Sequence, residues 1–85
     1  MAGQSYASAV ADLERVLEQG RGRLDTTTVK VIERNLASID SAIAQAQRAL
    51  AADSASVYLN SHLAETRQRK LELLRRAAAL VSSVS

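Results

Sequence analysis

One uninterrupted amphipathic run, residues 25–53, constrains the fold of this chain more than any other feature. Its apolar side chains recur at alternating steps of three and four residues, which is the repeat of one buried helix face; they are Val29, Ile32, Leu36, Ile39, Ile43, Ala46 and Leu50. No Gly or Pro interrupts the run. At about 1.5 Å per residue, a helix of this span is roughly 43 Å long. Its apolar side must therefore be covered by the flanking segments or by another chain.

The segment upstream of this run predicts a first helix at residues 5–23. The same three-and-four spacing starts at Tyr6 and continues as far as Leu24. Gly20 favours a helix end before that point, and we place the end near Arg23. The run Gly-Arg-Gly-Arg at this junction lacks the strand, the Lys and the Ser or Thr of a phosphate-binding loop. It therefore indicates a flexible connection.

Polar residues mark the starts of the second and third helices. Asp25 is positioned to cap a second helix at residues 26–52. Asp53, or alternatively Ser54, is the expected N-cap of a third helix at residues 54–82. So short a connection makes these two helices antiparallel neighbours.

These three helices predict an all-α fold, a three-helix up-down-up bundle built on a long antiparallel helical hairpin. Residues 1–85 form a single helical domain, because a chain of this length is too short to divide. Val31, Ala42 and Ala49 widen the apolar arc of the second helix beyond a narrow seam. We therefore expect that helix to lie between the other two.

The third helix carries a polar interruption on its apolar face. Thr66, Arg67 and Lys70 occupy positions where apolar residues should continue the stripe. Polar groups on a core face cost stability unless their heads reach water or partners. Two readings stay open. The helix turns its stripe across the bundle surface, which we favour, or these residues lie at a self-association interface and fix its register.

Composition points to association with other chains. Sixteen of the 85 residues are Ala, and the chain has no Phe or Trp, so its core is thin and aliphatic. Single cores of this size give marginal stability, which favours self-association. With no Cys there is no disulfide framework and the compartment is undetermined. The first residues, Met-Ala-Gly-Gln-Ser, lack the basic region and the apolar run of a signal peptide, and no apolar run approaches the ~20 residues of a membrane span.

Few residues have the chemistry of an active site. The chain contains one His, no Cys and no facing set of Glu with Glu-x-x-His. We therefore expect no enzyme, no cofactor, no metal and no small-molecule substrate. Basic side chains gather toward the end of the third helix, but interleaved acids, the absence of Trp and Phe, and a net charge of only +2 disfavour nucleic acid as a partner.

The prediction is a non-enzymatic helical module for protein–protein interaction or self-assembly, either a homo-oligomer or a binder of another helical protein. The expected partner contacts all lie on the third helix; they are Tyr58, His62, Thr66, Arg67 and Lys70. The alternative is a small binder of nucleic acid or anionic surfaces that uses the basic end of the third helix. Binding that weakens steeply with added salt would distinguish the alternative.

Several short phrases of the sequence also match a known pattern; they are Leu24-Asp25, Thr28-Val29, Glu33-Arg34-Asn35-Leu36, Ile39-Asp40, Ala42-Ile43, Ala49-Leu50-Ala51-Ala52-Asp53 and Lys70-Leu71-Glu72-Leu73-Leu74-Arg75. In this pattern the chain resembles the C-terminal, post-membrane helical region of bacterial zinc-finger anti-sigma proteins. The His/Cys zinc module and the membrane helix of that family are missing, and Ser54 stands where the family often has Pro. The resemblance implies a sensory or assembly part of a regulator, located on the extracytoplasmic, periplasmic side.

Overall fold

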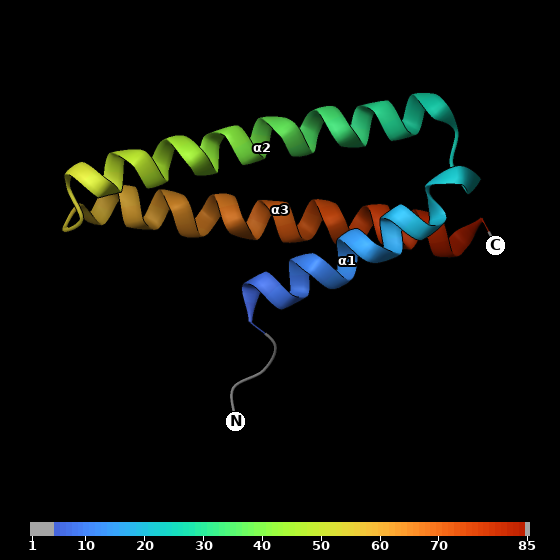
Figure 1. Cartoon of the computed structure of the whole chain (residues 1–85), viewed down its shortest axis with the longest axis horizontal. Helices are drawn as coiled ribbons and strands as arrows, with labels where there is room; N and C mark the ends of the chain where they lie inside the picture. The colour runs from blue at the N-terminus through green and yellow to red at the C-terminus, as the bar shows by residue number, and fades with distance from the viewer. Residues whose placement is uncertain (1–4, 85) are drawn as a thin grey trace.

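The computed structural model describes residues 5–84 and has four helical elements. They are α1 (Tyr6–Gly20), the short 3-10 helix η1 (Arg21–Arg23), α2 (Thr26–Ala52) and α3 (Val57–Ser83). Figure 1 shows α2 and α3 running antiparallel as a long hairpin, with α1 lying obliquely across the C-terminal part of α3. The predicted all-α, three-helix bundle is confirmed, and residues 5–84 contain no strand.

The central helix is α3, which packs along both α1 and α2, whereas α1 and α2 scarcely approach each other. Our prediction that the second helix lies between the other two is wrong. Five residues of α3 are buried and only two of α2. Thr66 and Ala77 are small members of the buried set on α3, and small side chains let a second helix come close.

Gly20 marks the tightest approach between α1 and α3. It is buried at the last position of α1 and lies against the side chain of Val81. Its φ of −104° is open to any residue. The glycine is therefore needed for space and not for backbone freedom.

The junction between α1 and α2 is an ordered turn. The chain continues from Gly20 into η1, and the N–H of Leu24 donates to the carbonyl of Arg21 at 3.1 Å. The predicted end near Arg23 is thus the end of η1, three residues after α1 itself ends. Asp25 occupies the N-cap position of α2 as expected, although its side chain makes no capping hydrogen bond.

The predicted start of the third helix is wrong by three residues. The N–H of Asp53 donates to the carbonyl of Ala49 at 3.0 Å, so Asp53 closes α2 and does not open α3. The N-cap is Ser56, whose Oγ accepts from the N–H of Leu59 at 3.1 Å. Residues 53–56 are needed to reverse the chain, which delays the first turn of α3 to Val57.

The molecule is long and flat. Its backbone extends over 46 × 34 × 14 Å, because α2 and α3 lie side by side and α1 diverges from α3 without closing against α2 (Figure 1). The buried apolar core is accordingly small and contains Val10, Ile32, Ala46, Leu63, Leu74, Ala77 and Val81. Within residues 5–84, no helix is long and apolar enough to cross a membrane.

Candidate functional site

The hairpin has an end that α1 does not cover. Tyr6 of α1 lies beneath Arg67, and Gly20 lies against Val81, so α1 follows α3 only along its C-terminal part. Figure 1 shows the other end of the hairpin extending beyond α1 as two helices alone. We call this part, residues 41–63, the open end.

The open end is nearly free of charge. The chain carries 11 basic and 9 acidic side chains, and only Arg48 and Asp53 of these lie within residues 41–63. The two have opposite signs. Most of the chain's charge is therefore concentrated where three helices meet, and the hairpin tip presents a neutral surface.

Apolar and aromatic side chains lie exposed at this tip. Val57 is 79% exposed and Tyr58 is 74% exposed, at the first turn of α3. The Tyr58 ring stacks on the ring of His62 at 6.0 Å between centroids, with an angle of 6° between the planes. Leu50 and Leu59 lie nearby in sequence and are only half-buried. Two helices alone leave these side chains without full cover.

Thr66 is held inside the bundle. It is only 4% exposed, and its Oγ1 donates to the carbonyl of His62 at 2.8 Å. The hydroxyl is thus satisfied by its own helix, which explains how a polar residue can occupy a core position. Buried in this way, Thr66 is not available at the surface of the chain.

Arg67 and Lys70 connect α3 to its two neighbours. The guanidinium of Arg67 lies 5.5 Å from the centre of the Tyr6 ring on α1, within cation–π range. Lys70 Nζ donates to Asp40 Oδ1 on α2 at 2.7 Å and lies 3.9 Å from Glu14 Oε2 on α1. The polar interruption therefore lies inside the three-helix arrangement.

The environment of Lys70 stabilises its charged form. Burial of the side chain, which is 13% exposed, acts to lower the pKa of Lys70. The hydrogen bond and charge of Asp40, followed by Tyr6 and Glu14, outweigh that effect and hold the pKa above its usual value. Lys70 is therefore a cation shared between two helices.

The five predicted contact residues thus divide into two groups. Tyr58 and His62 lie together at the open end, and Thr66, Arg67 and Lys70 contact other residues of the same chain. Within residues 5–84, Arg67 Nε is buried without a hydrogen-bond partner. Sequence reasoning named Tyr58 and His62 at this tip but missed the exposed Val57, although the scarcity of charge between Arg48 and Glu65 was visible in the sequence.

The basic residues of α3 do not form one surface. Arg67 and Lys70 are used internally, whereas Arg69, Arg75 and Arg76 are exposed. Among the residues described, no group of three or more His, Asp or Glu side chains is placed to hold a metal ion. Comparison with known proteins finds no family, no curated protein and no solved structure that matches this chain.

Proposed function

We propose that this chain is a helical protein–protein interaction module that self-associates through its open end. The observation that carries the proposal is the uncovered, nearly neutral part of the hairpin, residues 41–63, with Val57 and Tyr58 exposed at its tip. Large apolar side chains on an uncharged surface are typical of interaction sites. A second copy of the chain is the partner we favour.

The small charge of the open end supports a symmetric pair. In a two-fold interface the same surface patch of both copies meets, so that residue i contacts residue j and j contacts i, and a patch of one strong charge would repel itself. Arg48 and Asp53 have opposite signs and avoid this repulsion. Two hairpin ends packed together would form four helices around one core, which is a stable arrangement.

The open end is small, and small interfaces are typical of weak, reversible association. Residues 41–52 of α2 span roughly 18 Å at about 1.5 Å per residue. Two helices of that length offer a surface near the lower limit of specific interfaces, which bury about 1,200 Å² in total. We therefore expect pairing with a dissociation constant in the micromolar range.

Sedimentation equilibrium over a hundredfold range of protein concentration tests this proposal. The mass should rise from 9.1 kDa toward twice that value. Val57→Lys places a charge at the proposed two-fold interface and should raise the dissociation constant of the dimer at least tenfold. Val31→Lys makes the same change at an exposed residue of α2 outside the open end and should leave the mass unchanged. A mass fixed at one chain, or equal behaviour of both variants, would exclude pairing through the open end.

We extend the proposal to the setting that the sequence resemblance implies, the extracytoplasmic sensory part of an anti-sigma-type regulator. Its support is the set of short phrases between Leu24 and Arg75. In such a regulator, reversible pairing of hairpin ends would supply the assembly step.

A further inference from the structure

A cleft of about 260 Å³ lies between α1 and α2, at the end of the bundle away from the open end. It exists because both helices rest on α3 and diverge from η1 (Figure 1). Its apolar walls come from both sides, with Leu17 on α1 and Val29, Ile32 and Leu36 on α2. The cleft therefore has an apolar lining to which both helices contribute.

The rim of this cleft is acidic. Its charged side chains are Glu14, Glu18, Glu33 and Arg21. Arg21 spans the gap, with Nη2 2.6 Å from Glu33 Oε2 and Nη1 3.7 Å from Glu18 Oε1. Three carboxylates and one guanidinium leave a local charge of −2, in a chain whose net charge is +2.

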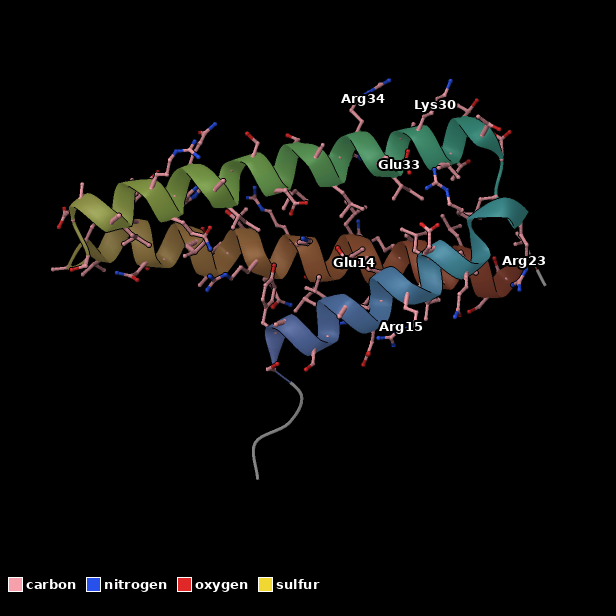
Figure 2. The ribbon with its side chains drawn as sticks, in the orientation of Figure 1. Glu14, Arg15, Arg23, Lys30, Glu33 and Arg34 are labelled. Carbon is pink, nitrogen blue, oxygen red and sulfur yellow. The ribbon has the colours of Figure 1, made fainter. Side chains whose placement is uncertain are left out.

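Glu14 of α1 and Glu33 of α2 line the cleft from different helices. Figure 2 shows both between the helices, whereas Lys30 and Arg34 of α2 point away from α3. The nearest internal cation to Glu14 is Lys70 at 3.9 Å, but Lys70 is already hydrogen-bonded to Asp40 at 2.7 Å. The carboxylate of Glu14 is thus only weakly paired by the contacts around it.

We propose that this cleft binds a small organic cation with a short apolar stem, of the alkylammonium type. The stem would lie against the apolar walls, where burial from water favours it, and the ammonium would lie among the rim carboxylates. The cleft is slightly smaller than the roughly 300–1,000 Å³ of sites for drug-sized ligands, so a shorter molecule fits. An anion with the same stem would meet repulsion instead.

Titration of the ¹⁵N-labelled full chain with hexylammonium, followed by amide chemical shifts in low salt, tests this inference. We expect saturable shifts at residues of the cleft and a dissociation constant on the order of 1 mM, which is reasonable for so small a ligand. Hexanoate, with the same stem and the opposite charge, should bind at least tenfold more weakly. Equal binding of hexanoate, or shifts that do not saturate, would overturn the proposal.

Variants separate the rim charges from the apolar walls. Glu14→Gln with Glu18→Gln should weaken hexylammonium binding roughly three- to tenfold, since each exposed charge contributes modestly. Glu65→Gln with Glu72→Gln removes the same charge outside the cleft and should leave binding unchanged. Unchanged binding in the first double variant would refute the assignment to the rim. Repeating the titration with Val57→Lys distinguishes this site from the open end, because a ligand site between α1 and α2 should persist in that variant.

Discussion

Replacing Gly20 with Ala tests how closely α1 crosses α3. A Cβ atom at this position would overlap Cγ1 of Val81 and lie 3.0 Å from its Cβ and Cγ2. The backbone of Gly20, with φ −104° and ψ −2°, suits Ala equally well. The substitution therefore introduces no backbone strain, and its destabilising effect comes from packing.

The expected loss follows from two opposing effects. Overpacking a well-filled site costs about 1–3 kcal/mol, whereas Ala is favoured over Gly in a helix by about 1 kcal/mol. Val81 is buried and has little freedom to move aside, and the helix preference is weaker at the end of α1. We expect Gly20→Ala to lower the free energy of unfolding by about 1–2 kcal/mol. Each kcal/mol lost lowers Tm by roughly 4–8 °C in a chain of this size.

Urea denaturation followed by circular dichroism at 222 nm measures this change, at one fixed protein concentration because pairing would add stability. Gly22→Ala is the matched control, since a Cβ at Gly22 meets nothing within 4 Å. It should be neutral or stabilising by up to about 1 kcal/mol. Adding Val81→Ala to Gly20→Ala should cost less than Val81→Ala costs in the wild-type chain. If Gly20→Ala is as stable as Gly22→Ala, the close crossing of α1 and α3 is refuted.

Two further substitutions test single contacts. Lys70→Met should lower the free energy of unfolding by about 1 kcal/mol at pH 7, because it removes a hydrogen bond to an exposed carboxylate. The folded-state pKa of Lys70 is raised above 10.5, so the wild-type chain should lose this contribution to stability as the pH rises through that pKa. Urea denaturation from pH 9 to 12 should therefore show a smaller fall in the free energy of unfolding for Lys70→Met than for the wild-type chain. Equal falls in the two proteins would contradict the stabilising role of charged Lys70. Ser56→Ala should lower the free energy of unfolding by about 1 kcal/mol because it removes the N-cap of α3, whereas Ser54→Ala should lower it far less. Thermal denaturation compares the two variants, and a larger loss in Ser54→Ala would indicate that α3 starts at residue 54 or 55.

The sequence predicted helices well where one uninterrupted pattern defines them. Residues 26–52 were predicted for the second helix, and α2 has those bounds. The start of α3 was missed because Asp53, Ser54 and Ser56 are all good capping residues within four positions. Choosing among them depends on where the chain can reverse, which is a property of the loop and not of any one residue.

The order in which the helices pack was not predictable from their apolar arcs. The wide arc of α2 indicated two neighbours, yet Val31 on that arc is exposed. The position of α1 depends instead on the fit of Gly20 against Val81 and of Arg67 over Tyr6. Each of these pairs joins residues about 60 positions apart, and no repeat along one helix reveals such a match.

The interaction surface expected from the structure differs from the one expected from the sequence, and the polar interruption of α3 is the reason. From sequence, Lys70 was a candidate for contact with a partner, but its actual partner, Asp40, lies 30 positions earlier in the same chain. Because Thr66 and Lys70 are satisfied internally, little would be gained by bringing a second chain to the middle of α3. The two most exposed large apolar side chains lie at the open end, with Val57 at 79% and Tyr58 at 74%; Val16, Val31, Leu80 and Val84 are also exposed, at 39–48%, but lie outside it. Self-association, if driven by burial of apolar surface, should therefore form at the hairpin tip and leave the Lys70 contacts unchanged.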